Sequence, residues 1–299
     1  MKKKISVGTW AYIFGAKGDR QFPFDDCLAK IKDLGFDGLE LGAWAPHPTP
    51  AEYDTVEKRQ ALAQKIADAG LGISGLAIDF HGKYPFQPDQ QDYLDEFKTN
   101  LHFCRDLGIK VIRVDTDVAP DSVTSDNEKE ALAKTIDTWK KCAQHAAEHG
   151  IRLVWEFEPG FAFNKPSQII AIAEGVDEPN FGLMYDTCHA EMCAAVGARQ
   201  PGARETLPGG AMELLEKLQG HIGAVHVIDS DGSLHDDETS THNPFGEGHL
   251  DFDKLIPALL ACGAPTDWWC IDLCFWPQAW EATEKCKVAL DGLLAKYDR

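Results

Sequence analysis

A helix that ends in glycine and is followed at once by a short apolar run recurs along the whole chain of 299 residues. Glycine most easily takes the left-handed conformation just past a helix end, so each such glycine predicts a joint between a helix and a strand. The six joints lie at Gly35, Gly70, Gly108, Gly150, Gly220 and Gly263. A chain built in this way alternates helices and strands from one end to the other.

The spacing of the joints predicts the number of strands. Successive joints lie about 35 to 43 residues apart, the length of one strand, one helix and their loops, except for a double interval of about 70 residues after Gly150. Residues 181–185 supply the strand that this interval requires, and residues 5–10 supply one before the first joint. The eight predicted strands are residues 5–10, 38–41, 73–76, 111–114, 151–154, 181–185, 222–228 and 268–273.

Amphipathic segments with the apolar spacing of a helix lie between the predicted strands. The clearest of them cover residues 24–34, 94–104, 132–143 and 252–259. Eight alternating units predict one α/β domain over residues 1–299, a (β/α)8 TIM barrel. A doubly wound open sheet is the alternative, but no glycine-rich phosphate loop follows the first predicted strand, and the number of units favours a closed barrel.

The charge of the chain argues against several classes of partner. Its 48 acidic and 29 basic residues give a formal net charge of −19, which would repel nucleic acids and anionic membranes. No stretch reaches the ~20 apolar residues of a membrane-spanning helix, and polar residues interrupt the N-terminal apolar run. Nine cysteines without a paired framework suit a reducing compartment. We expect a cytoplasmic protein with no nucleic-acid or membrane partner, and leave open whether it forms a homo-oligomer.

Acidic and imidazole side chains gather at the ends of the last four predicted strands. In barrels of this kind the active site forms at the carboxyl ends of the strands, so these residues are expected to meet there. Buried carboxylates that converge without an Arg or Lys nearby repel one another, and a divalent cation resolves that conflict. The predicted ligands of one ion are Glu156, Asp186, His226 and Asp272, a set that suits Mn2+, with Mg2+ or Co2+ as alternatives.

Each of these residue types also has an ordinary structural role. A single Asp at a strand end is commonly the N-cap of the next helix, because it accepts hydrogen bonds from the free amides there. A lone His is commonly a core or surface residue whose ring nitrogens are bonded locally. The occurrence of all four residues on adjacent strands favours the metal site.

Four runs in the second half of the chain carry a resemblance to a known family. They are Leu-Val-Trp-Glu-Phe-Glu-Pro-Gly at 153–160, Gly-Leu-Met-Tyr-Asp-Thr-Cys-His at 182–189, Val-His-Val-Ile-Asp-Ser-Asp-Gly at 225–232 and Pro-Phe-Gly-Glu-Gly-His-Leu-Asp-Phe at 244–252. Over essentially its whole length the chain resembles the xylose-isomerase-like sugar phosphate isomerase and epimerase superfamily. The resemblance implies the same four metal ligands, and it implies that His189 contacts a substrate oxygen.

The resemblance also implies an enzyme that acts on a small carbohydrate, a ketose or keto-sugar. In that family the metal chelates neighbouring carbonyl and hydroxyl oxygens, and a carboxylate removes the proton beside the carbonyl to form an enediolate. Glu156 would be this base, and an acid on the opposite face would return the proton for epimerisation. A lyase, hydratase or dehydratase of 3-keto-glycosides is the close alternative, because it begins with the same proton abstraction.

The chain departs from the ketose 3-epimerases of that family at three positions. Asp272 stands where those enzymes use a Glu as ligand and second base. Ala162 and Gly232 stand where they have a Glu and an Arg. A free ketohexose is therefore not an assured substrate, and the second acid or base has to be sought elsewhere as well as at Asp272.

Several other residues are candidate acids, bases or substrate contacts. Glu158 lies two residues past Glu156, on the same side if the strand continues. The long loop after the seventh strand carries His235, His242 and His249, of which His249, beside the Gly-Glu-Gly turn, is preferred. The predicted substrate contacts are His189, Glu158, His249, Trp10, His81, Asp115 and Trp276, with Glu40 and Lys83 as weaker candidates.

Two further function classes are weighed against this hypothesis. The same superfamily contains endonucleases that cut at abasic sites with three zinc ions, but the charge of −19 and the few imidazoles at the strand ends disfavour that activity. A metal-free sugar-binding protein would leave the clustered acids without a partner. The scarcity of Arg and Lys at the strand ends also disfavours a phosphosugar as substrate.

Overall fold

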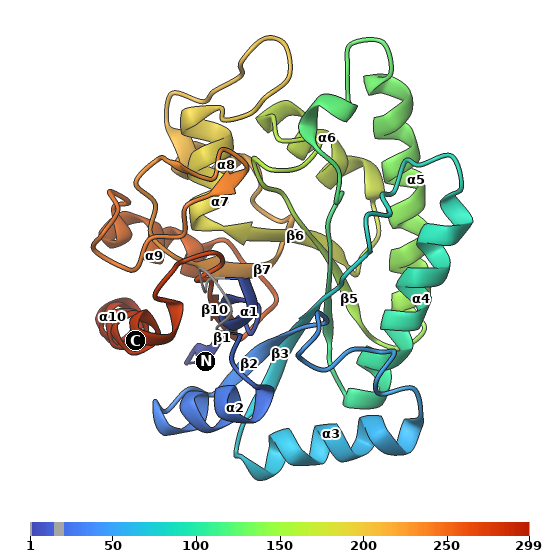
Figure 1. The fold of residues 1–299 in the computed structure, drawn as a ribbon. Helices are drawn as coiled ribbons and strands as arrows, with labels where there is room; N and C mark the ends of the chain where they lie inside the picture. The colour runs from blue at the N-terminus through green and yellow to red at the C-terminus, as the bar shows by residue number, and fades with distance from the viewer. Residues whose placement is uncertain (1, 15–20, 299) are drawn as a thin grey trace.

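Eight parallel strands form a nearly closed barrel in the computed structural model, which describes residues 2–14 and 21–298 (Figure 1). The strands are β1 (Lys4–Val7), β2 (Gly38–Gly42), β3 (Gly72–Ala77), β4 (Val111–Val114), β5 (Arg152–Glu156), β6 (Phe181–Asp186), β7 (Ile222–Val227) and β10 (Trp268–Ile271). They pair in the order β1-β10-β7-β6-β5-β4-β3-β2, and a parallel bridge between Gly8 and Glu40 joins the two ends of that order. The predicted TIM barrel and its eight strands are confirmed.

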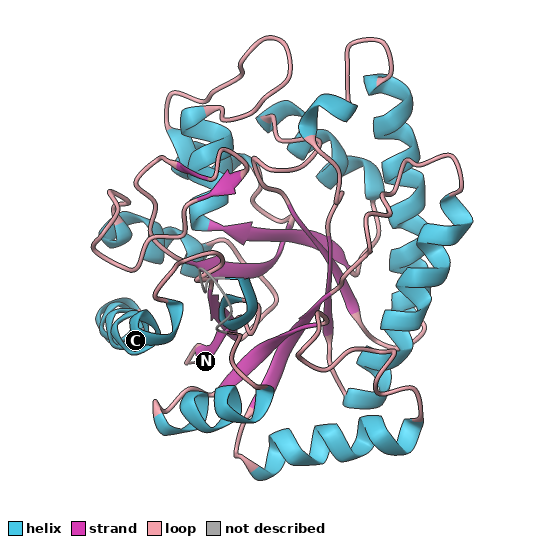
Figure 2. Ribbon diagram, viewed as in Figure 1, coloured by secondary structure: helices cyan, strands magenta, loops and turns pink. Residues whose placement is uncertain are grey.

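Helices surround the strands (Figure 2). They are α1 (Ala11–Phe14), α2 (Phe24–Asp33), α3 (Val56–Asp68), α4 (Gln90–Leu107), α5 (Glu128–Ala147), α6 (Pro166–Val176), α7 (Thr187–Glu191), α8 (Gly210–Lys217), α9 (Phe252–Ala261) and α10 (Ala279–Tyr297). A 3-10 turn spans Pro120–Ser122, and a π-helical turn at Met192–Val196 continues α7. Within the described ranges, none of the helices has the length and apolar character that crossing a bilayer requires.

The six predicted joints all have left-handed backbone at the glycine. The φ angles are 71° at Gly35, 80° at Gly70, 76° at Gly108, 63° at Gly150, 89° at Gly220 and 77° at Gly263. At Gly108, which caps α4, the amide donates to the Arg105 carbonyl at 3.1 Å and the chain then reverses into β4. The repeated glycine is therefore the local device that returns each of these helices to the barrel.

Two structural details differ from the predicted strands. The strand predicted at 5–10 ends at Val7, because residues 8–10 turn into α1 with a hydrogen bond from Tyr12 N to Thr9 O. A two-stranded hairpin, β8 (Leu234–His235) and β9 (Thr239–Ser240), stands in the long loop after β7 and was not predicted. Strands of two residues are too short to show an alternating pattern. The turn at residues 8–10 and the β8–β9 hairpin both place side chains over the carboxyl ends of the barrel strands.

A buried aromatic contact links two outer helices to the barrel wall. Trp139 of α5 packs against Trp155 of β5, with ring centroids 5.1 Å apart. Its indole nitrogen donates to the Tyr93 hydroxyl of α4 at 3.0 Å, and both side chains are fully buried. The Tyr93 hydroxyl thus supplies the hydrogen-bond acceptor that the buried indole N–H requires.

We expect Tyr93→Phe to destabilise the protein by about 1–3 kcal/mol, because it leaves the buried Trp139 N–H without an acceptor. Urea unfolding followed by far-ultraviolet circular dichroism measures the loss. Tyr84→Phe is the matched control, since the Tyr84 hydroxyl makes no hydrogen bond within the described part of the chain. Equal stability of the two variants would contradict the role given to the Tyr93 hydroxyl.

Candidate metal centre and substrate cavity

Four side chains converge at the carboxyl ends of neighbouring strands. Glu156 and Asp186 are the last residues of β5 and β6, His226 is the last but one of β7, and Asp272 follows β10 directly. One atom of each lies within 4.8 Å of one atom of every other, and none of the four side chains is more than 2% exposed. These are the four residues that the sequence analysis singled out as ligands.

Each carboxylate of this cluster uses one oxygen to bind the protein. Glu156 Oε2 accepts a hydrogen bond from the Arg113 guanidinium at 2.5 Å. Asp186 Oδ1 accepts from the backbone amides of Cys188 and His189 at 2.7 and 2.9 Å. Asp272 Oδ1 accepts from the Trp10 indole at 2.9 Å and from the Cys274 amide at 2.8 Å. Asp186 is thus also the N-cap of α7, so its structural role and its place in the cluster coexist.

The remaining atoms of the cluster face one another. His226 Nδ1 lies 2.8 Å from Glu156 Oε1, 3.5 Å from Asp272 Oδ2 and 4.0 Å from Asp186 Oδ2. Despite the short first distance, Nδ1, Glu156 Oε1 and Asp186 Oδ2 are buried without a correctly oriented hydrogen bond in the described ranges. Unpaired buried oxygens of this kind are costly, and a cation between them would satisfy them. The donor set therefore fits a divalent metal ion.

The charges of the cluster shift one another's protonation. Burial raises the pKa of Asp186 well above its usual range, and the neighbouring carboxylates raise it further. Burial acts on Glu156 in the same direction, but Arg113 and His226 outweigh it and lower that pKa to about 2. For His226, burial is outweighed by the charges of Glu40 and Glu156, and its pKa is raised well above the usual value. The site thus has an excess of negative charge, which protons or a cation would neutralise.

Arg113 contradicts the expectation that no Arg or Lys lies near the converging carboxylates. It is the third residue of β4, only 8% exposed, and it bonds Asp115 at 3.0 Å as well as Glu156. Its guanidinium lies 5.1 Å from the Trp10 ring centroid. The sequence does not reveal this position of Arg113, because a single Arg in the apolar run Val-Ile-Arg-Val does not show which face of the strand is inside.

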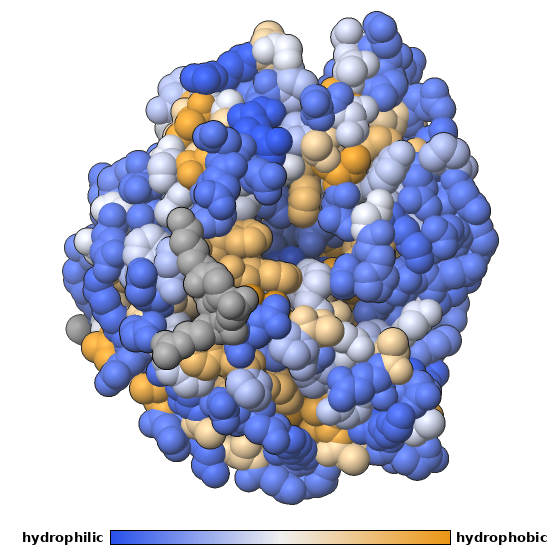
Figure 3. All heavy atoms as spheres, viewed as in Figure 1, coloured by the Kyte–Doolittle hydropathy of each residue, from blue (hydrophilic) through white to orange (hydrophobic). Residues whose placement is uncertain are grey.

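A cavity of about 400 Å³ opens over the cluster, and Figure 3 shows the face of the molecule hollowed at its centre. Glu156 and Asp272 line it, together with aromatic side chains and a group of polar ones. The aromatic lining includes Trp10, Phe14, Trp44 and Phe275. Apolar walls with a few convergent polar groups are typical of a small-molecule site.

Four of the predicted substrate contacts line this cavity: Trp10, Asp115, Glu158 and His189. Burial, helped by the charge of Asp115, raises the pKa of Glu158 to about 8. Burial lowers the pKa of His189 to about 3, and its Nδ1 lies 2.8 Å from Ser240 Oγ. The cavity therefore offers a protonated carboxyl and a neutral imidazole as hydrogen-bonding groups at neutral pH.

Among the loop histidines, the structure brings His242 to the cavity and leaves the preferred His249 outside it. His242 is 1% exposed and 3.9 Å from Asp272 Oδ2, and neither ring nitrogen has a hydrogen-bond partner in the described chain. His249 is largely exposed, with Nε2 3.1 Å from Glu191 Oε1. His235 lines a smaller neighbouring hollow. The β8–β9 hairpin in this loop sets which imidazole points into the cavity, and no sequence pattern predicts that hairpin.

Two more predicted contacts lie outside the cavity over the cluster. The His81 side chain is 63% exposed and lies 3.1 Å from Asp79. His81 has a positive φ of 54°, so the chain turns just after β3 and directs this side chain outward. Trp276 lines the smaller hollow. Both residues follow a strand end, but the turn beyond that end sets their direction.

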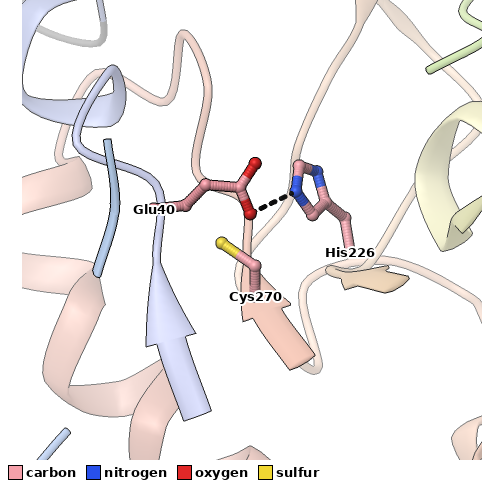
Figure 4. Close-up of side chains that lie close together, drawn as sticks. All are labelled: Glu40, His226 and Cys270. Atoms are coloured by element: carbon pink, nitrogen blue, oxygen red, sulfur yellow. Dashed lines mark hydrogen bonds and ion pairs between the residues drawn. The ribbon is translucent and has the colours of Figure 1, made fainter. Parts of the chain in front are cut away.

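Behind His226 lies a further carboxylate, Glu40 of β2. Its Oε2 is 3.2 Å from His226 Nε2, on the ring side opposite the cluster, and Cys270 of β10 lies beside the pair (Figure 4). A proton on Nε2 would be donated to Glu40 and leave the Nδ1 lone pair facing the cluster, which is how a neighbouring carboxylate orients a metal-binding His. Glu40, predicted as a weak substrate contact, is thus placed to orient His226.

Asp229 folds the loop that contains the Gly-Glu-Gly turn. Its two carboxylate oxygens accept from the amides of Ser230 at 2.9 Å, Gly246 at 2.9 Å, Gly248 at 3.1 Å and Leu250 at 3.1 Å. A Cβ on Gly248 would collide with this carboxylate, so glycine is required for the close approach. The aspartate and the glycines of this motif therefore serve the loop rather than the metal centre.

The family model described as xylose isomerase-like TIM barrel matches residues 28–285 of this chain. The 2-oxo-tetronate isomerase of Pectobacterium atrosepticum is 23% identical over 243 residues, which cover 77% of this chain and 82% of that protein. The inosose dehydratase of Geobacillus thermodenitrificans is 24% identical over 186 residues, which cover 56% of this chain and 55% of that protein. The solved structure of the IolI protein with a bound zinc atom has a TM-score of 0.73 and 19% identity, and the alignment covers 98% of this chain and 99% of that one.

We expect Asp229→Asn to loosen residues 243–250, because an amide oxygen replaces a charged acceptor shared by several backbone amides. Hydrogen exchange followed by mass spectrometry should show these amides exchanging about tenfold faster, as the loss of a charge-assisted hydrogen bond predicts. Asp231→Asn is the matched control in the same loop, since the Asp231 carboxylate accepts from the amide and hydroxyl of Ser233 and not from residues 246–250 in the described chain. Similar exchange in both variants would argue against the role of Asp229.

Proposed function

The chain belongs to the xylose isomerase-like TIM-barrel family, and from that membership we propose that it is a divalent-metal-dependent isomerase or epimerase of a ketose or keto-sugar. One observation carries the proposal. Three carboxylates each keep one oxygen on a protein donor and turn the other toward the cluster around His226 Nδ1. This cluster borders a cavity of small-molecule size, as a metal-assisted sugar reaction requires.

Glu156, Asp186, His226 and Asp272 would hold the ion. Their oxygen-rich set favours Mn2+, with Mg2+ or Co2+ as alternatives. When bound, the ion supplies a positive charge that polarises a substrate carbonyl and favours negative charge on its oxygen. The zinc of the IolI structure makes Zn2+ a fourth metal to test.

Glu156 is the proposed base. It is a carboxylate on the cavity wall, and Arg113 holds Oε2 and leaves Oε1 toward the cluster. Since Oε1 would hold the ion, Oε2 is the oxygen that would take the proton from the carbon beside the substrate carbonyl. His189 is proposed to bind a substrate oxygen through Nε2, because Ser240 occupies its Nδ1. Glu158 would hydrogen-bond a second substrate oxygen from the same strand end.

The return of the proton separates the two proposed reactions. Epimerisation needs an acid on the face opposite Glu156, and Asp272, Glu158 and His242 all line the cavity. A lyase or dehydratase of 3-keto-glycosides needs an acid for the departing oxygen instead. Two observations support this second function: the buried His242 ring has no hydrogen-bond partner in the described chain, and two of the curated relatives are inosose dehydratases.

We expect the purified protein to bind one divalent ion per chain, measured by isothermal titration calorimetry and elemental analysis. Glu156→Gln and Asp186→Asn should abolish measurable binding, because each removes a charged ligand. Glu40→Gln should weaken binding about 10- to 100-fold, because it frees the His226 ring without removing a ligand. Asp231→Asn should bind normally. Wild-type affinity in both ligand variants would exclude this metal site.

We expect the Mn2+-loaded protein in D2O to place deuterium on the carbon beside the carbonyl of a ketose or 3-keto-glycoside, as seen by NMR. Glu156→Gln or chelation should remove the exchange, since loss of a positioned base costs about 10²- to 10⁴-fold. His242→Gln should keep the exchange and slow product formation if the imidazole supplies the second proton. The product, epimer or unsaturated sugar, distinguishes the two functions. An absence of exchange with every sugar, in protein shown to hold metal, contradicts both.

A further inference from the structure

The cavity over the candidate metal centre has a smaller neighbour of about 220 Å³. His242, Cys274 and Phe275 line both hollows. The smaller hollow is completed by His235, Thr241, Trp276, Pro277 and Gln278. Since three residues belong to both linings, the two hollows are adjacent compartments of one site.

Phe275 is a shared wall of these compartments. Its φ of 58° lies in the left-handed region, which is unusual for a residue with a bulky side chain. Its ring stacks on Phe14 of the larger cavity, with centroids 5.6 Å apart, and on His235 of the smaller one, with centroids 5.0 Å apart. Such backbone strain persists where surrounding contacts hold a side chain in place, and it is concentrated at ligand sites. Here it places one ring along both compartments.

The chemistry of the smaller hollow differs from that of the larger one. No carboxylate, Lys or Arg is found in its described lining, whereas carboxylates and two arginines line the cavity over the cluster. The smaller hollow offers the aromatic faces of Phe275 and Trp276, and hydrogen-bonding groups of His235, Thr241 and Gln278. Flat apolar faces beside uncharged polar groups match the surface of a sugar ring, whose C–H and O–H groups lie on different sides.

We propose that the smaller hollow is a subsite for an uncharged sugar ring linked to the keto-sugar that reacts over the metal centre. The preferred substrate is then a keto-disaccharide rather than a free ketose. This inference rests on the proposed function, because it takes the larger cavity as the place of the reacting ring. Phe275 and His242, which line both hollows, would lie against the linkage between the two rings.

The test compares two substrates that differ only in the second ring: methyl 3-keto-glucoside and the 3-keto form of a glucose disaccharide. We expect the wild-type protein to exchange deuterium into the disaccharide with a kcat/KM about tenfold higher, as one well-packed aromatic contact provides. Trp276→Ala should remove this advantage through KM and leave the methyl glycoside unaffected. Equal kcat/KM for the two substrates in the wild-type protein would overturn the subsite and leave the proposed reaction standing.

A second variant keeps the test independent of folding, because Trp276 also packs against the core. Gln278 is exposed, and its side chain makes no cap hydrogen bond to α10, so Gln278→Ala should fold normally. It should raise KM for the disaccharide several-fold and not for the methyl glycoside, whereas the exposed Gln219→Ala should change neither. An equal effect of Gln278→Ala on both substrates contradicts the subsite.

Binding of the unoxidised disaccharide, measured by calorimetry, tests the subsite without turnover. Tighter binding than that of methyl glucoside, lost in Gln278→Ala, supports it even if neither keto-sugar exchanges deuterium. In that case the failure belongs to the proposed reaction alone. Equal binding of both glucosides, or retention of the difference in Gln278→Ala, overturns the subsite.

Discussion

Three buried carboxylates meet one imidazole at the carboxyl end of the barrel, and the surrounding structure is arranged around that concentration of charge. Each acid has a different protein donor: Arg113 for Glu156, the first amides of α7 for Asp186, and the Trp10 indole with the Cys274 amide for Asp272. Glu40 lies at the far nitrogen of His226. These partners come from β1, β2, β4, β6 and β10 or the turns that follow them, so the cluster depends on barrel closure. One oxygen of each acid remains directed inward, where a cation can bind.

The metal cluster and the cavity wall have different proposed roles, and the cavity wall would determine which reaction follows the first step. In the proposed function the cluster would carry out the first step, proton removal beside a carbonyl, which isomerisation and elimination share. The candidates for the second acid, which would distinguish the two outcomes, lie on the cavity wall at Asp272, Glu158 and His242. In the proposed subsite, substrate choice would depend on residues still farther out, around Phe275. On this proposal, catalysis and substrate specificity would depend on different segments, the strand ends and the loops that follow β7 and β10.

Much of the candidate site could be predicted from the sequence, and the part that could not has a common cause. Glu156, Asp186, His226 and Asp272 stand at strand ends, where the strand pattern itself shows the position of the side chain. The position of Arg113 could not be predicted, because a closed barrel buries both faces of β4 and no alternation of polar and apolar residues distinguishes them. His242 and His249 stand seven residues apart in one loop, and only the β8–β9 hairpin and the hydrogen bonds of Asp229 direct one inward and the other to solvent.

The sequence by itself determined the periodic alternation of helices and strands, because six glycines at or just past helix ends are local signals and need no tertiary partner. It also determined that the acids and the imidazole stand at the carboxyl ends of strands. Only the tertiary structure decided which oxygen of each acid turns toward the cluster, which basic and imidazole groups face the cavity, and where Phe275 lies between the two hollows. Those features arise from contacts between residues far apart in the chain, such as Trp10 with Asp272 and Glu40 with His226, and no local pattern encodes them.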